Sequence, residues 1–146
     1  MKRFNFRLEK LLHLREFYER KAEIELAHAI AYLDSLKLAL KNIASLYAQN
    51  SQKLNFDGST VSIDELHSIQ NCIIRLNKEK DELINKSVQA QIIIDEKRKI
   101  YIEAASKRKA ISKLKEKKLE EWKKENIKAE DDFIDDLVTY KTAVTG

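Results

Sequence analysis

The chain has 146 residues with two glycines and no proline, so it offers few positions at which the backbone can turn sharply. Charged residues make up 36% of the sequence and aromatic residues 8%, a balance that excludes a thick globular core and favours a narrow helical seam. The single cysteine, Cys72, excludes an internal disulfide. No stretch approaches the roughly 18 uninterrupted apolar residues that cross a bilayer, and nothing at the N-terminus resembles a secretory leader, so we expect a reducing, cytoplasmic setting.

Apolar residues recur from Leu8 to Leu54 in alternating steps of four and three, and eleven of the fourteen positions reached in this way are apolar. Sustained over many heptads, this spacing is typical of a left-handed coiled-coil seam. We therefore predict a first helix over about residues 4–55. Asn50 falls on the seam, where a polar residue commonly fixes the register of helix pairing.

The heptad pattern stops at residues 56–61, which contain Gly58. Because glycine readily takes a positive φ, we predict that the chain reverses here. Residues 62–65, with the sequence Ser-Ile-Asp-Glu, form a capping box that begins a second helix over about residues 62–143. Four polar residues interrupt the seam of this second helix: Lys80, Ser87, Lys97 and Arg108.

The two predicted helices differ in length. If pairing starts at the turn, residue 4 lies level with about residue 113, and the helix from about residue 114 projects by about 45 Å. Residues 1–146 are thus predicted to form a single all-α domain, an antiparallel coiled-coil hairpin with a C-terminal overhang. We interpret an apolar stripe on the overhang as a binding surface for a partner. A frayed, partly disordered tail is the alternative. The stripe consists of Trp122, Phe133, Leu137 and Tyr140.

Charge is uneven along the second helix. Residues 97–128 hold thirteen Lys or Arg against five acids, whereas residues 130–136 hold five acids and no base. A basic stripe could follow nucleic-acid phosphates, but interspersed glutamates such as Glu120 favour charge pairing on a solvated face. We therefore predict no nucleic-acid partner.

No motif in the sequence indicates catalysis. Glycine-rich phosphate loops need more glycines than the two present, and the three histidines are too far apart to form a closed metal site with Cys72. A slender helix pair also offers no concave, partly dry pocket for a reaction. We predict that the protein is not an enzyme, uses no cofactor or metal, and acts by binding other proteins.

The segment from Phe4 to Glu16 has the order F-x-F-x-L-x-x-L-L-x-L-R-E, and Glu19, Ala22 and Leu26 follow it. This order resembles the N-terminal signature of the FliJ family. The resemblance implies a rod similar to the central stalk of a rotary ATPase, in the flagellar type III export apparatus at the cytoplasmic face of the inner membrane. It also implies that the protein promotes assembly and activity of the hexameric export ATPase and links it to the export gate and export chaperones.

By this analogy, the paired ends of the chain enter the ATPase ring. The ATPase-binding residues expected are Phe4, Phe6, Leu11, Arg15, Arg108, Lys117 and Lys118. The gate is expected to contact the part of the hairpin near the turn, through Ile43, Tyr47, Asn50, Cys72, Ile73 and Leu76. At the position that aligns with Cys72, members of the family often have a larger apolar residue. Two alternatives stay open, a stalk of a virulence type III system and a purely structural coiled coil that homodimerises.

Overall fold

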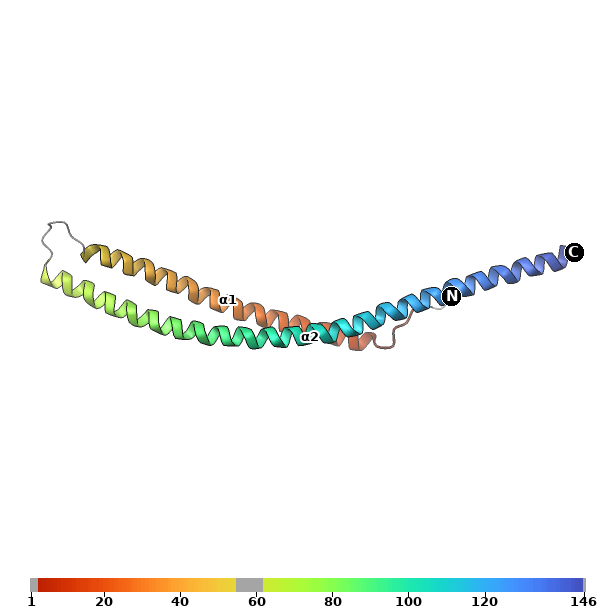
Figure 1. Cartoon of the computed structure of the whole chain (residues 1–146), viewed down its shortest axis with the longest axis horizontal. Helices are drawn as coiled ribbons and strands as arrows, with labels where there is room; N and C mark the ends of the chain where they lie inside the picture. Colours follow the sequence, from red (N-terminus) through yellow and green to blue (C-terminus); the bar gives the residue numbers. More distant parts are fainter. Residues whose placement is uncertain (1–2, 55–61, 146) are drawn as a thin grey trace. The chain divides into compact units, whose positions relative to one another are not determined.

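The computed structural model describes residues 3–54 and 62–145, which form two helices, α1 (Glu9–Leu54) and α2 (Ile63–Thr145) (Figure 1). The described residues contain no strand. The prediction of an all-α fold built from two long packed helices is confirmed. The predicted turn at residues 56–61 lies outside the described residues.

The chain divides into two compact units, and each helix contributes to both. Unit 1 comprises Met1–Lys21 with Ile102–Gly146, and unit 2 comprises Ala22–Tyr101. Within unit 2, the two helices run side by side in opposite directions (Figure 1). That residues 1–146 act as one hairpin domain stays a prediction.

The core of unit 2 lies on the predicted seam. Leu33 and Leu36 from α1 pack with Ala90 and Ile94 from α2, and Leu26, Ala29 and Leu83 are partly buried against this cluster. Burial of such apolar side chains is worth about 1.5 to 3 kcal/mol for each large residue, so the seam accounts for the pairing of the helices.

Ser87 and Lys97, two of the polar interruptions of the seam, have hydrogen-bond partners within unit 2. The Ser87 hydroxyl donates to the backbone carbonyl of Leu83 at 2.8 Å. The Lys97 ammonium lies 3.3 Å from the Glu25 carboxylate across the two helices of unit 2. A polar group with a partner avoids the penalty of an unsatisfied one, which explains why the seam tolerates these residues.

Helix α2 starts at the predicted capping residue. The backbone N–H of Glu65 donates to the Ser62 hydroxyl at 3.2 Å, and the N–H of Leu66 donates to the Ser62 carbonyl at 3.0 Å. The first bond satisfies a backbone donor that has no partner within the helix, and the second is the first hydrogen bond of the helix itself. The sequence signal for this helix start is confirmed.

Helix α1 begins at Glu9, so the prediction of a helix from about residue 4 is wrong. Residues 3–6 are not helical; Phe6 is buried, Phe4 is half-buried and Asn5 between them is exposed. This alternation is that of an extended segment, whose successive side chains point to opposite sides. The Glu9 N–H donates to the Phe6 carbonyl at 3.2 Å, and this turn carries the chain into α1.

Candidate partner-binding surfaces

The residues that the structure describes contain no group of three or more His, Cys, Asp or Glu arranged to hold a metal ion. Among the same residues, neither helix combines the length and apolar character needed to span a membrane.

Unit 1 contains a groove between the extended N-terminal segment and α2. The Phe4 ring lies 6.0 Å from the Trp122 ring, centroid to centroid, with their planes inclined at 58°. Aromatic pairs in this range attract one another beyond simple area burial. The groove has a volume of about 1110 Å³, and we call it the N-terminal groove; its lining includes Arg3, Phe4, Phe6, Arg7, Leu8, Leu114, Lys118, Trp122 and Phe133.

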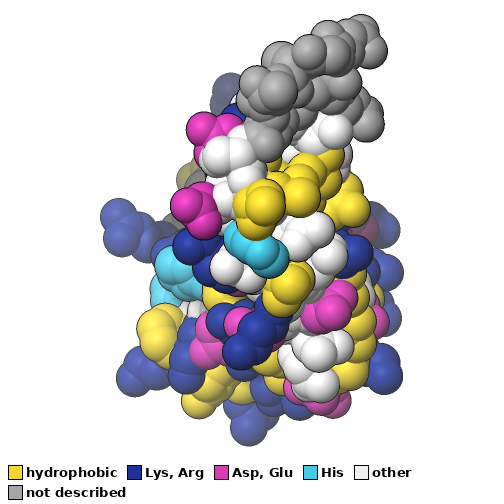
Figure 2. Space-filling view, turned by 90° about the vertical axis from the view of Figure 1, so that its left-hand side faces the viewer, with side chains coloured by type: hydrophobic (Ala, Val, Ile, Leu, Met, Phe, Trp, Pro, Cys, Tyr) yellow, Lys and Arg dark blue, Asp and Glu magenta, His cyan; other side chains and the backbone are white. Residues whose placement is uncertain are grey.

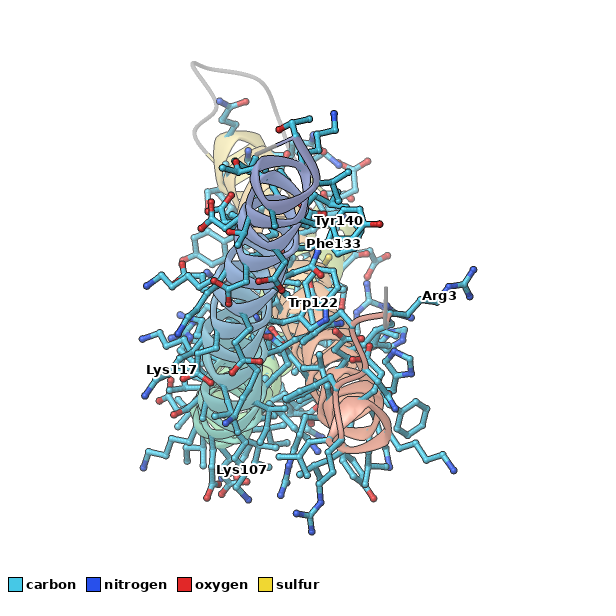
Figure 3. All side chains as sticks on the ribbon, turned by 90° about the vertical axis from the view of Figure 1, so that its right-hand side faces the viewer. Arg3, Lys107, Lys117, Trp122, Phe133 and Tyr140 are labelled. Carbon is cyan, nitrogen blue, oxygen red and sulfur yellow. The ribbon has the colours of Figure 1, made fainter. Side chains whose placement is uncertain are left out.

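Trp122 is therefore not a member of an unpartnered stripe, contrary to the prediction. The first segment of the same chain covers it, because the extended residues 3–6 lie beside α2. The remaining stripe residues, Phe133, Leu137 and Tyr140, are exposed as predicted. Figure 3 shows Trp122, Phe133 and Tyr140 along one side of α2, with Lys117 pointing away from them.

The exposed end of α2 starts later than predicted. Half-buried positions continue through Leu114, Leu119 and Asn126, and every residue from 127 to 145 is exposed. One cause is the register of the two helices. If pairing ran evenly from the turn, Glu9 would lie opposite a position of α2 several residues closer to the turn than Lys115, but it forms an ion pair with Lys115. The extended N-terminal segment is the second cause, because it advances about 3.3 Å per residue instead of 1.5 Å.

In unit 1, Arg108 and Lys115 of α2 form ion pairs with carboxylates of α1. The Arg108 guanidinium donates to both carboxylate oxygens of Glu19, at 2.6 and 3.4 Å, in a bidentate arrangement. The Lys115 ammonium donates to Glu9 at 2.9 Å, and the His13 imidazole lies 3.2 Å from the same carboxylate. The hydrogen bond from Lys115 lowers the pKa of Glu9 below its ordinary value, and its effect exceeds the opposing effect of desolvation.

The residues predicted to bind the ATPase all lie in unit 1 but do not form one patch. Phe4 and Phe6 form part of the groove, and Lys118 lines it and pairs with Glu121 at 3.5 Å. Lys117 is exposed on another side of α2 (Figure 3). Three further members are half-buried and thus only partly available to a partner: Leu11, Arg15 and Arg108.

Sequence reasoning missed an exposed apolar group on α1 of unit 1. Leu14, Phe17 and Tyr18 are all exposed, and the rings of Phe17 and Tyr18 meet edge to face at 5.7 Å. They are apolar residues that do not fall on the seam positions defined by alternating steps of four and three. Apolar side chains outside the seam were the signal that could have identified them.

The residues predicted to bind the export gate divide into buried and accessible members. Ile43 and Leu76 are buried, with 9% and 2% of their surface exposed, because both belong to the seam. The sequence analysis expects them to contact the gate, but their burial leaves little of either side chain accessible to a partner. Tyr47 is exposed, and Ile73 is half-buried.

Asn50 and Cys72 from the same predicted set meet across the two helices of unit 2. The Asn50 side-chain amide donates to the Leu46 carbonyl at 2.9 Å and to the Cys72 sulfur at 3.5 Å. The Arg75 guanidinium also donates to this sulfur, at 3.9 Å. Asn50 therefore makes a polar contact between the two helices, and its predicted role in fixing the register of pairing stays a prediction.

Ile74 is an accessible residue that the sequence analysis did not select, with 66% of its surface exposed. It follows Ile73 directly on α2 and lies one residue off the seam. Figure 2 looks onto this end of the chain and shows exposed apolar side chains beside histidines and charged residues. Ile74, beside the seam, and Tyr47, on the seam itself, therefore both supply accessible apolar surface here.

Two long helices joined by an apolar seam and ion pairs, with further apolar side chains left exposed, define the chain as a coiled-coil protein. The family model described as flagellar FliJ protein matches residues 4–144. The chain belongs to the FliJ family and is thus a component of the flagellar export apparatus. Comparison with curated proteins and with solved structures gives no match.

Proposed function

We propose that the chain is a stalk-like subunit of the flagellar type III export apparatus. In this proposal unit 1 binds the export ATPase hexamer and promotes its assembly and activity, and unit 2 contacts the export gate. Membership of the FliJ family over residues 4–144 is the observation that carries the proposal, since the match includes both the N-terminal signature and nearly all of α2. The protein would act at the cytoplasmic face of the inner membrane, held there through its partners.

The exposed groups of unit 1 are the best candidates for contact with the ring. Lys117 and Lys118 carry accessible charge, and Leu14, Phe17 and Tyr18 supply accessible apolar surface. Phe4 and Phe6 act indirectly in this proposal, by holding the N-terminal segment on Trp122. Arg108 likewise acts by fixing the two helices through Glu19.

The ATPase assignment is tested by adding the purified chain to the export ATPase and following hydrolysis together with ring assembly. Lys117→Glu with Lys118→Glu is expected to reduce stimulation at least fivefold, because reversed charge turns attraction into repulsion. Lys78→Glu with Lys80→Glu makes the same change of charge at exposed positions of unit 2 and should leave stimulation intact. Equal stimulation by both variants would remove Lys117 and Lys118 from the proposed contact.

The gate assignment is tested by pull-down with the cytoplasmic part of the gate protein. Tyr47→Ala with Ile74→Ala should weaken binding about tenfold, since both side chains are accessible and each truncation removes apolar contact. Ile24→Ala with Ile84→Ala offers a matched control at exposed positions elsewhere in unit 2. A gate protein that binds all these variants alike would contradict the assignment.

Export chaperones are the third class of proposed partner, and family membership alone supports them. Co-sedimentation of the chain with chaperones from the same export system tests this part separately. The accessible Phe17 and Tyr18 are the first side chains to truncate, because exposed aromatic residues are frequent binding hot spots. If Phe17→Ala with Tyr18→Ala retains chaperone binding, these two residues do not contribute to that binding.

A further inference from the structure

The stretch of α2 from residue 102 to residue 128, which belongs to unit 1, has an excess of positive charge. It holds ten basic residues and five acids. Arg108, Lys115 and Lys118 have ion-pair partners. The other seven basic residues are lysines, and none of them forms an ion pair within the part of the chain that the structure describes. Their charge is therefore available to a partner outside the chain.

Five of these lysines lie along one face of α2, and we call them the lysine row; they are Lys109, Lys113, Lys117, Lys124 and Lys128. They follow one another at intervals of four, four, seven and four residues, which return to the same side of a helix. All five are exposed, and the row is about 28 Å long at 1.5 Å per residue. Figure 3 shows that Lys117 points away from Trp122. Two acids, Glu116 and Glu120, lie beside the row, so lysines outnumber carboxylates there by five to two.

A shallow recess of about 470 Å³ lies at the N-terminal end of the lysine row. Its lining consists of Ile102, Ala105, Ser106, Lys109, Ala110 and Lys113. The lining contains two ammonium groups and one hydroxyl but no carboxylate. None of these three polar groups has a hydrogen-bond partner among the described residues. The recess therefore offers free donors to an anion, next to the apolar side chains that complete its lining.

The row and the recess together favour the surface of an anionic lipid bilayer over a nucleic acid. A straight row on one side of a helix can bring all five ammonium groups to a flat surface at once, whereas the phosphates of a duplex curve away from a straight rod. Single-stranded nucleic acids are bound largely by stacking on aromatic side chains, and neither the row nor the recess contains an aromatic residue. A lipid headgroup, in contrast, presents a phosphate directly above apolar chains, which matches the two kinds of side chain in the recess.

A lipid surface also fits better than an acidic protein. Protein interfaces are anchored by apolar or aromatic side chains near their centre. The middle of the row, from Lys113 to Lys124, presents only lysine and glutamate on this face. The exposed apolar side chains on this face lie at its two ends, where Ile102 and Ile127 expose 59% and 57% of their surface.

We infer that the lysine row and its recess form a binding site for the anionic lipid surface of a membrane. The ammonium groups of the row lie at the level of the lipid phosphates. One headgroup enters the recess, where the Ser106 hydroxyl and the ammonium groups of Lys109 and Lys113 donate to its phosphate. This contact is direct and adds to any attachment through partner proteins. It requires only the chain itself, so its tests are independent of the ATPase and gate assignments.

Co-sedimentation of the full chain with vesicles gives the first test. The chain should bind vesicles of phosphatidylcholine mixed with phosphatidylglycerol roughly a hundredfold more tightly than vesicles of phosphatidylcholine alone. The binding should weaken as the salt concentration rises, because salt screens exposed charges. A chain that does not bind the mixed vesicles at low salt would overturn the inference.

Charge reversal locates the binding site. One variant reverses four lysines of the row and keeps Lys117, which belongs to the ATPase proposal; its substitutions are Lys109→Glu, Lys113→Glu, Lys124→Glu and Lys128→Glu. The matched control reverses four exposed lysines of α1; its substitutions are Lys10→Glu, Lys21→Glu, Lys37→Glu and Lys41→Glu. The row variant should bind the mixed vesicles roughly a hundredfold more weakly or worse, because each lysine near an anionic surface contributes about fivefold. The control should keep most of the affinity. Equal losses would mean that net charge alone governs binding, and the site would be overturned.

A fluorescent label shows which side of α2 meets the membrane. In a Cys72→Ser background, Glu120→Cys places an environment-sensitive dye beside the lysine row, and Glu125→Cys places it on the side of the N-terminal groove. Both positions are exposed, and both substitutions remove one negative charge. The emission of the dye at position 120 should move to shorter wavelength on the mixed vesicles, and the emission at position 125 should change little. A larger change at position 125 would overturn the arrangement.

The recess has a test of its own. Ser106→Asp places a carboxylate beside Lys109 and Lys113, and it should weaken binding to the mixed vesicles about fivefold. Ser68→Asp introduces the same charge at an exposed serine of unit 2 and should have little effect. If both variants bind alike, the recess holds no headgroup.

Duplex DNA is the probe for the competing class of ligand. At equal salt concentration and equal concentration of phosphate groups, the chain should bind the duplex roughly tenfold more weakly than the mixed vesicles. Tighter binding to the duplex that is lost in the row variant would assign the lysine row to nucleic acid and overturn the lipid assignment.

Discussion

The seam of unit 2 and the C-terminal tail of unit 1, residues 127–145, are both helical and both rich in apolar residues, but only the seam is buried. Leu33 and Leu36 lie against Ala90 and Ile94 of α2 and expose less than a tenth of their surface. Leu137 and Tyr140 expose about half or more, because no described residue covers them. Heptad spacing therefore predicts which face of a helix is apolar enough to pack against another helix. It does not predict whether that other helix belongs to the same chain.

The largest expected effect compares two adjacent isoleucines of unit 2. Ile94→Ala should destabilise the protein by about 2 to 4 kcal/mol, because Ile94 is almost fully buried and truncation leaves a cavity. Ile93→Ala should change stability by less than about 0.5 kcal/mol, since Ile93 is exposed. Urea unfolding followed by circular dichroism measures both. Equal losses would mean that the seam does not govern pairing in unit 2.

The second effect concerns the anchor of the N-terminal segment. Phe4→Ala should release the segment from Trp122, at a cost of roughly 1 to 2 kcal/mol because Phe4 is only half-buried. The chain has one tryptophan, so a shift of its fluorescence to longer wavelength reports this release directly. Phe17→Ala removes an exposed aromatic residue of the same unit and should leave the emission unchanged.

Much of the fold follows from local sequence patterns. The seam through Leu33 and Leu36 is confirmed because four-and-three spacing is a property of the helix itself. The start of α2 is confirmed because Ser62 and Glu65 lie three residues apart, within reach of each other in any helix start. Both signals need no knowledge of distant residues.

The N-terminal segment could not be predicted in the same way. A three-residue alternation, Phe4-Asn5-Phe6, is too short to distinguish an extended segment from the first turn of a helix. What decides its conformation is contact with Trp122, which is far away in the sequence. The gate residues Ile43 and Leu76 illustrate the same difficulty, because the pattern that marks them as apolar also places them in the seam.

A third effect concerns the ion pair between Arg108 and Glu19. Both side chains are largely shielded from solvent and the contact is bidentate, so Glu19→Gln should cost roughly 1 kcal/mol. The exposed pair of Lys118 and Glu121 is the comparison, and Glu121→Gln should cost a few tenths of a kcal/mol at most. Thermal unfolding at two salt concentrations separates them. A larger loss for Glu121→Gln would reverse this ranking.

The smallest effect is a dependence on pH at Glu9. Its pKa is lowered in the folded protein by the hydrogen bond from Lys115, with a smaller contribution in the same direction from His13. A carboxyl group whose pKa is lower in the folded state than in the unfolded state stabilises the fold above the unfolded pKa. That contribution is lost as the pH falls through the lowered value.

Side-chain carbon NMR of Glu9 measures this shift. Lys115→Gln should raise the pKa of Glu9, because it removes the hydrogen bond that is the largest cause of the lowered value. Lys118→Gln removes a nearby cation that pairs with Glu121 instead, and it should leave the titration of Glu9 unchanged. If Lys115→Gln has no effect on the titration, the hydrogen bond from Lys115 is not the cause of the lowered pKa of Glu9.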